Sequence, residues 1–266
     1  MAWVASSDQC VTLSGRLANM GYDVSILLAI LAIALGGVMK GAIGAGMPII
    51  AAPALTMLFN VQTAVAVLVV PNLLSNIWQA WHFRAQAMPM RFLVLFAGGG
   101  MLGVIVGTYL LSILPQEILQ LLVAIAVLAY IALRLARPNW ALQKPLAQSL
   151  SGPAGIMGGF LQGATGISAP ASITFLNAMK LPRETFIATI SIFFVAMSAT
   201  QMVSLWQVGL MSLDTLTWGF AALGLVFLSM PLGNWLGRRA SPRVFDRTML
   251  AILAAIAAKI LFEALI

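Results

Sequence analysis

The sequence has almost none of the residues that hold metals or carry out acid–base chemistry. It contains one cysteine, Cys10, and one histidine, His82, among its 266 residues. A single cysteine cannot form an internal disulfide bond, and these two residues are too few for a Cys-rich metal site or a His-ligated haem. We therefore expect no metal site, no cofactor and no catalytic residues.

Charged residues of either sign are scarce as well. They make up 8% of the chain, whereas 61% of the residues are hydrophobic and the mean hydropathy is +1.01. A soluble domain has about a quarter charged residues and needs them to cover its surface. The sequence therefore predicts a protein whose partner is the lipid bilayer. Its apolar runs are long and continuous, which favours an all-α polytopic membrane protein over a barrel of short alternating strands.

The seven acidic residues all lie near the ends of apolar runs or in the connections between them. A proton relay usually needs a carboxylate or a histidine within a membrane span, and none is evident. The same shortage leaves few groups for acid–base catalysis, so we expect that the protein is not an enzyme. The chain also lacks a GxxxxGK[ST] run, which excludes ATP-driven transport by this chain alone.

Apolar runs and helix-breaking residues divide the chain into ten expected helices. The expected helices are 24–43, 48–59, 62–83, 90–112, 116–136, 149–165, 169–179, 184–207, 213–237 and 243–265. Two of them, 48–59 and 169–179, are too short to span a bilayer, because a spanning helix needs about 20 residues. Residues 1–23 lack a basic region directly followed by an apolar core. We expect them to form a short peripheral segment and not a cleaved signal peptide.

Two glycine-rich stretches are related to each other. Residues 36–48 read GGVMKGAIGAGMP and residues 158–170 read GGFLQGATGISAP, at a shift of 122 residues. Each is followed by one short and three long apolar segments. We therefore expect two repeats, residues 24–136 and 149–266, joined by a cytoplasmic linker over 137–148.

Basic residues indicate the orientation, because Lys and Arg concentrate in cytoplasmic loops. Four connections hold most of the 14 basic residues, and placing these connections inside accounts for the net charge of +7 without a nucleic-acid partner. Both ends of residues 149–179 then lie inside, so this segment must enter the membrane and return as a re-entrant-like hairpin. Each repeat becomes a hairpin plus three crossings, which makes the repeats inverted and puts both termini outside, in the periplasm of a bacterium.

Interrupted helices at matching positions of inverted repeats mark the substrate site of many transporters. A helix that begins inside the membrane presents unpaired N–H groups and a partial positive charge, and an anion satisfies both. We expect Pro48 and Pro170 in the first turn of the two short helices, where proline leaves no unpaired N–H. Gly44, Gly46 and Gly166 would form the turns before them. For the leading glycines of each stretch, close helix packing is the favoured interpretation.

Lys40 is the one charged residue within the first glycine-rich stretch, and Gln162 is its counterpart in the second. A buried lysine in a membrane usually serves a substrate or a partner. Two alternatives are that Lys40 reaches the membrane surface or pairs with Asp23. Several other polar residues within spans would contact substrate or form hydrogen bonds between helices. The candidate substrate-binding residues are Lys40, Gly44, Gly46, Pro48, Asn72, Asn76, Gln162, Thr165, Gly166, Ser168, Pro170, Ser198 and Gln201.

The paired glycine-rich tips, the short helices behind them and the sequences PNLLSN (71–76) and WHFR (81–84) resemble the TauE/SafE family of sulfite exporters. The resemblance extends over about residues 24–266. It implies transport of sulfite, sulfonates or thiosulfate, mostly outward across the bacterial cytoplasmic membrane, with the candidate residues at the site. One departure is the second tip, where Ser168 and Ala169 replace glycines common in the family.

Our functional hypothesis is a secondary carrier for a small sulfur oxyanion, held near the midplane between two opposed helix starts. Alternating access would come from one repeat rocking against the other. An anion channel and an importer of organosulfonates coupled to an ion gradient are the alternatives, and a membrane enzyme or assembly factor is a third class. The sequence leaves open which anion is carried and whether the protein is a homo-oligomer.

Overall fold

The structure, a computed structural model, describes residues 5–136, 140–239, 250–251 and 253–259. Within these ranges every regular element is a helix. The elements are α1 (Ala5–Ile43), α2 (Met47–Leu58), α3 (Val61–His82), the 3₁₀ helix η1 (Arg84–Gln86), α4 (Met90–Ile113), α5 (Gln116–Ala136), α6 (Lys144–Thr165), α7 (Ser172–Ala178), α8 (Arg183–Gln207) and α9 (Leu213–Arg239). The predicted all-α class is confirmed.

Six of the described helices are long and apolar enough to cross a membrane. They are Val24–Ile43 of α1, then α3, α4, α5, α8, and Leu213–Gly237 of α9. The helix α2 is apolar but has only 12 residues. This set confirms the predicted polytopic membrane protein, whereas the inverted relation of the two halves stays a prediction.

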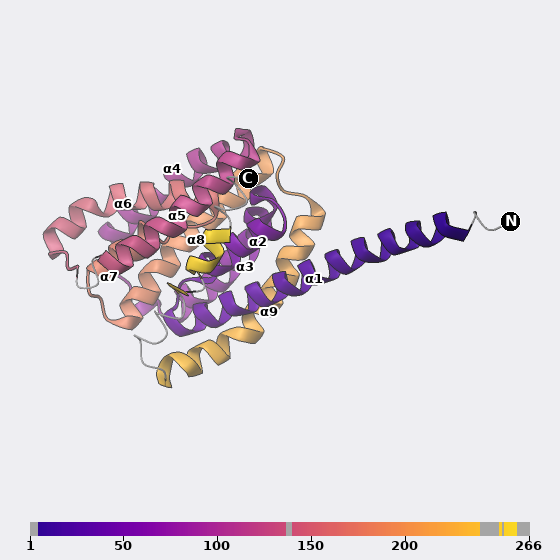
Figure 1. The fold of residues 1–266 in the computed structure, drawn as a ribbon. Helices are drawn as coiled ribbons and strands as arrows, with labels where there is room; N and C mark the ends of the chain where they lie inside the picture. The colour runs from indigo at the N-terminus through magenta and orange to yellow at the C-terminus, as the bar shows by residue number, and fades with distance from the viewer. Residues whose placement is uncertain (1–4, 137–139, 240–249, 252, 260–266) are drawn as a thin grey trace.

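Three helices begin several residues away from their expected starts. The helix α1 begins at Ala5, so the residues expected to precede the first helix continue it toward the N-terminus, and Figure 1 shows this end extending beyond the other helices. The helix α6 begins at Lys144, and α7 begins only at Ser172. Most of the tenth expected helix, 243–265, lies outside the described residues, and residues 250–251 and 253–259 within it are helical.

The helices form two groups that meet at α3 and α8. The helix α1 packs against α9 and α2, and α3 packs against α9; α6 packs against α4, and α8 packs against α4. Figure 1 shows α4, α5 and α6 on one side and α1 and α9 on the other, with α3 and α8 between them. The strongest helix pairs, α4–α6 and α1–α9, each join one half of the sequence to the other.

Glycines allow these two helix pairs to approach closely. A side chain at Gly103 of α4 would overlap the carbonyl oxygen of Ile156 in α6, and one at Gly159 of α6 would overlap that of Gly100. In the other pair, a side chain at Gly233 of α9 would overlap the carbonyl oxygen of Val38. Small residues at such contacts bring helix backbones together in lipid. Close packing is therefore the role of Gly159, as we expected for the leading glycines.

Replacing Gly103 by alanine should destabilise the protein. The added methyl group must push α4 away from α6, and overpacking of this kind costs about 1–3 kcal/mol. The matched control is Gly98→Ala in the same helix, where a Cβ atom would meet no atom within 4 Å. That change should leave stability unchanged or raise it by about 1 kcal/mol through helix propensity. Thermal unfolding of both purified variants in detergent measures the difference, and equal stabilities would contradict the packing role.

Candidate functional site

The first interruption follows α1. This helix ends at Ile43, and Gly44 adopts a left-handed conformation with φ 76° while its N–H donates to the carbonyl oxygen of Lys40 at 2.8 Å. Gly46, with φ 123°, is the N-cap of α2, and Pro48 lies in the first turn of that helix. Glycine adopts these positive φ angles without steric cost. The chain thus breaks where the sequence predicted, and the predicted proline lies in the first turn of α2.

The second interruption begins in the same way. The helix α6 ends at Thr165, Gly166 has φ 75°, and its N–H donates to the carbonyl oxygen of Gln162 at 2.8 Å. The conformation and the hydrogen bond match those of Gly44 and Lys40 at the shift of 122 residues. The first helix of each hairpin therefore ends with the same glycine conformation and the same backbone hydrogen bond.

The second short helix, however, does not begin at Pro170. The Ser168 carbonyl oxygen accepts hydrogen bonds from the N–H groups of Ala171 and Ser172, at 3.1 and 2.9 Å, and this turn includes Pro170. The Ser172 hydroxyl donates to the Ser168 hydroxyl at 2.9 Å and strengthens the turn. The expectation that Pro170 lies in the first turn of a helix is therefore wrong. A serine hydroxyl competes for backbone groups in a way that glycine cannot.

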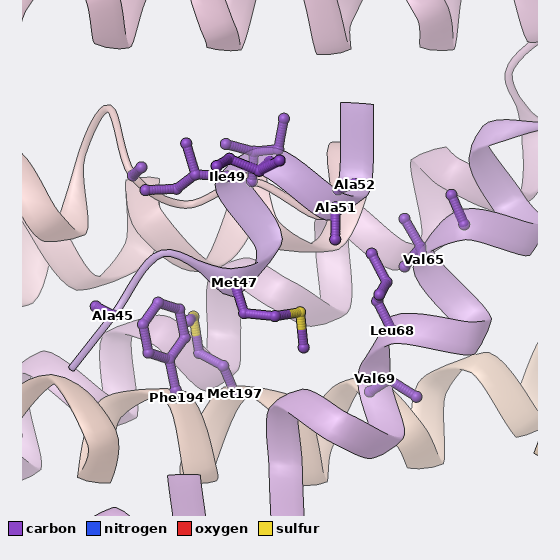
Figure 2. Packing of buried hydrophobic residues seen from close by; sticks show 14 of the residues in the cluster. Ala45, Met47, Ile49, Ala51, Ala52, Val65, Leu68, Val69, Phe194 and Met197 are labelled. Carbon is purple, nitrogen blue, oxygen red and sulfur yellow. The ribbon is translucent and has the colours of Figure 1, made fainter. Parts of the chain in front are cut away.

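Both short helices begin beside the long helix that precedes them. Met47, at the start of α2, packs against Gly36, which lies one turn before Lys40. Ser172, at the start of α7, packs against Gly158, one turn before Gln162. Figure 2 shows the Met47 side chain between Leu68 of α3 and Met197 of α8. After each glycine turn, the chain therefore folds back to the same relative depth before its short helix begins.

Each glycine turn also contacts a long helix of the other half. A side chain at Gly166 would lie 3.2 Å from Val65 in α3 and 3.3 Å from Ala52 in α2. One at Gly44 would overlap Ile187 in α8. Val65 and Ile187 are themselves separated by 122 residues. The contacts of the two turns are therefore equivalent under the sequence repeat.

Lys40 is buried, with 1% of its surface exposed, and its Nζ donates a hydrogen bond to Asn76 Oδ1 at 2.8 Å. This burial excludes the alternative in which Lys40 reaches the membrane surface. Pairing with Asp23 is also excluded, because the two residues lie on one continuous helix at a separation of about 25 Å. The acidic residues whose exposure the structure describes, Glu117, Glu184 and Asp214, are exposed. The buried ammonium group thus faces a neutral amide.

A hydrogen-bond network extends from Lys40 to α8. The Asn76 amide nitrogen donates to Asn72 Oδ1 at 2.9 Å, and the Asn72 amide nitrogen donates to Ser198 Oγ at 2.9 Å. All four side chains are buried. Asn72 lies near the middle of α3, so the network crosses the central part of the membrane-spanning region. The structure therefore brings together four of the predicted site residues from α1, α3 and α8.

Gln162 and Gln201 form a second contact, one turn of α8 beyond Ser198. The Gln162 amide nitrogen donates to Gln201 Oε1 at 3.5 Å, and the Gln201 amide nitrogen donates to the Gln162 carbonyl oxygen at 3.2 Å. Gln162 Oε1 is buried and has no hydrogen-bond partner among the described residues. The pair of glutamines thus contains one buried acceptor, Gln162 Oε1, without a hydrogen bond from the described residues.

Two predicted residues serve the second turn itself and do not join the network. Thr165 Oγ1 donates to the Leu161 carbonyl oxygen at 2.7 Å and accepts the N–H of Ile167 at 3.2 Å. The carbonyl and hydroxyl oxygens of Ser168 both accept the hydroxyl of Ser172. Their hydrogen bonds therefore hold the backbone of the second interruption.

Gln79 is a buried polar residue close to the network that the sequence motifs did not identify. Gln79 of α3 is 3% exposed, and its Oε1 accepts a hydrogen bond from Ser191 Oγ of α8 at 3.4 Å. A signal for it was present, because Gln79 precedes Gln201 by the same 122 residues that separate Asn76 from Ser198. The repeat therefore preserves a pair of polar residues three positions apart on each of α3 and α8.

The structure also has a cavity of about 590 Å³ that lies elsewhere. Its lining is apolar apart from Ser25 and Thr63, and it lies between α1, α2, α3 and α9. None of the predicted site residues lines it. The buried network, and not this cavity, has the chemistry to bind a polar solute.

Interrupted helices and a buried, charged polar network inside a bundle of membrane-spanning helices define a membrane transporter. The family described as the sulfite exporter TauE/SafE matches residues 29–260, and the chain belongs to this family. The predicted family is therefore confirmed, and with it a multi-pass membrane transporter of the sulfite-exporter type. No curated protein and no solved structure shows a significant match to the chain.

The contact between Lys40 and Asn76 predicts a measurable coupling of their contributions to stability. Asn76→Leu alone should destabilise by about 2–3 kcal/mol, because it removes the acceptor of a buried ammonium group. Combined with Lys40→Met, the total cost should fall below the sum of the single effects by at least about 1 kcal/mol. Thermal unfolding of the four proteins of this cycle gives the coupling energy.

The matched control combines Asn76→Leu with Lys144→Met, a change of the same kind at an exposed residue. These two effects should add within about 0.5 kcal/mol. Additive effects for Lys40 and Asn76 as well would show that the contact contributes nothing to stability.

Proposed function

We propose that the protein is a secondary carrier that exports a small sulfur-containing oxyanion, such as sulfite, a sulfonate or thiosulfate, across the bacterial cytoplasmic membrane. The single observation that carries this proposal is the buried ammonium group of Lys40, whose hydrogen-bond acceptor in the described structure is a neutral amide. An uncompensated charge in a protein interior costs several kcal/mol. An anion bound next to Lys40 supplies the compensating negative charge. The free energy lost by burying the ammonium group is then recovered when the substrate binds.

The surroundings of Lys40 suit an oxyanion. Lys40 is in the last turn of α1, and the same hairpin then forms the start of α2, with Gly46 as its N-cap. Helix starts present N–H donors and a partial positive charge to an anion. The amides of Asn72 and Asn76 add donors that can exchange their present partners for substrate oxygens. Lys40 gives the charge, and the neutral groups give orientation.

Matched contacts of the two halves support alternating access around this site. The glycine turns end their helices with the same hydrogen bond, and they pack at equivalent positions on α3 and α8. Such equivalence is expected of two repeats that exchange conformations when a carrier changes the side to which it opens. It favours a carrier over a channel, the alternative with the same anion preference.

The distribution of acidic residues favours transport driven by the membrane potential. In the described part of the chain, the buried polar and charged residues include no carboxylate that could carry a coupled proton. Outward movement of one negative charge from a cell with a negative interior gains about 2.3 kcal/mol per 100 mV. Export therefore needs no second ion in this proposal.

Lys40→Met should abolish transport. In proteoliposomes, flux of radiolabelled sulfite should fall at least tenfold, a loss of at least about 1.4 kcal/mol in the stabilisation of the transported anion. Lys144→Met is the matched control and should retain the wild-type rate, because Lys144 is exposed. Insertion and folding of both variants are checked by gel filtration. Transport by folded Lys40→Met protein at the wild-type rate would remove Lys40 from the mechanism.

Sulfite flux should follow an imposed voltage and ignore an imposed pH gradient. The physical reason is that the anion carries its own charge and that the buried residues whose exposure the structure describes include no proton-binding carboxylate. Potassium diffusion potentials set the voltage in proteoliposomes, and buffered gradients set the pH. A strict requirement for a pH gradient would overturn potential-driven export, and single-channel currents in place of saturable counterflow would indicate a channel.

A further inference from the structure

We infer that the interface between α3 and α8 is the route along which the anion moves, with Gln79 and Ser191 forming a further substrate-contacting position between Lys40 and the cytoplasm. We call this interface the α3–α8 seam and define it by Asn72, Asn76, Gln79, Ser191 and Ser198. The inference rests on the proposed function, since it assumes that Lys40 binds the anion.

The register of the two helices gives the seam its direction. Asn72 contacts Ser198, and seven residues further along α3 Gln79 contacts Ser191, seven residues back along α8. The helices are therefore antiparallel, and the two contacts lie about 10 Å apart along the seam. These two buried polar pairs extend from the middle of both helices toward one of their ends.

Polar groups occur in sequence along this line. From the outer side inward they are Gln162–Gln201, Asn72–Ser198, Lys40–Asn76 and Gln79–Ser191. Buried polar side chains in a membrane protein are expensive and mark solute pathways. Close packing of α3 against α8 would need none of these amides, since apolar side chains pack equally well. Their repeated placement on both helices is explained by a solute that must meet hydrogen-bonding groups at each step.

The end of the seam beyond Gln79 is the predicted cytoplasmic end. The chain continues from α3 to Arg84, and α8 begins at Arg183. Two contacts cover this end of the seam. The Met88 N–H donates to Thr189 Oγ1 at 3.2 Å, and an exposed Arg183 donates to the Ala42 carbonyl oxygen at 3.1 Å. Gln79 and Ser191 thus lie between this cover and Lys40, where an anion from the cytoplasm arrives first.

Neutral groups suit this position. A second cation next to Lys40 would hold the anion too tightly for movement, whereas conduction requires sites that bind and release. The carboxamide of Gln79 and the hydroxyl of Ser191 can each donate one hydrogen bond to an oxyanion. The Ser191 hydroxyl donates to Gln79 Oε1 in the structure, so an arriving anion would accept from this hydroxyl in place of the amide oxygen.

The test separates movement from binding. Gln79→Leu should lower sulfite flux in proteoliposomes at least about tenfold, while the dissociation constant for sulfite, measured by calorimetry on purified protein, stays within about threefold of wild type because Lys40 is intact. Gln79→Asn, which keeps a shorter carboxamide, should recover part of the flux. The matched control is Gln148→Leu at an exposed position, which should transport normally. Wild-type flux in folded Gln79→Leu protein would overturn the inference.

A second measurement does not depend on a change at Gln79. In a Cys10→Ser background, Ser191→Cys should react with an anionic methanethiosulfonate reagent added from the cytoplasmic side, and sulfite should slow the reaction. Adding Lys40→Met should remove this protection and leave the reaction itself intact. A cysteine at 191 that never reacts in actively transporting protein would overturn the route. If instead wild-type protein neither binds nor transports any sulfur oxyanion, the proposed function fails before the route is tested.

Discussion

The central constraint of this structure is a positive charge that is buried without a negative partner in the described protein. Lys40 is held in the interior in the last turn of α1, where Asn76 Oδ1 of α3 accepts a hydrogen bond from its ammonium group. Asn76 is held in turn by Asn72, and Asn72 by Ser198. Removing any one of these side chains would leave a buried polar group unsatisfied, and this is why the helices that carry them must keep their register.

The broken helices and the network depend on each other. If α1 continued past Ile43, the chain could not return to place the start of α2 beside Gly36. The glycine turn is therefore a precondition for a helix start inside the bundle, and its cost is met by packing on both sides. Met47 and the residues around it in Figure 2 supply this packing from α3 and α8. The first hairpin thus carries the polar contact of Lys40 in α1 and the apolar packing of Met47 at the start of α2.

Much of this architecture could be predicted from the sequence, because the physical rules for membranes are strict. Hydropathy gave the spanning helices, and the repeat of glycines gave both interruptions with the correct residues at positive φ angles. The start of α7 was not predictable from the alignment of Pro48 with Pro170, since the turn around Ser168 is held by local backbone and hydroxyl hydrogen bonds that the first hairpin lacks a serine to form. Gln79 could not be identified from the glycine and proline motifs, because its only signal in the sequence is the separation of 122 residues from Gln201.

The partners of the long helices could not be read from the sequence, since hydropathy does not say which helices touch. The glycine contacts show that α1 is tied to α9 and α6 to α4, so each tightly bound pair contains one helix from either half of the chain. Rocking of one repeat against the other would therefore have to change the contacts within both pairs. Helices from both halves of the sequence therefore lie together in each group: α1, α2 and α3 pack with α9 in one, and α4 packs with α6 and α8 in the other. The two groups meet along α3 and α8, so the contact surface between them is the surface that carries the buried amides of Asn72 and Gln79.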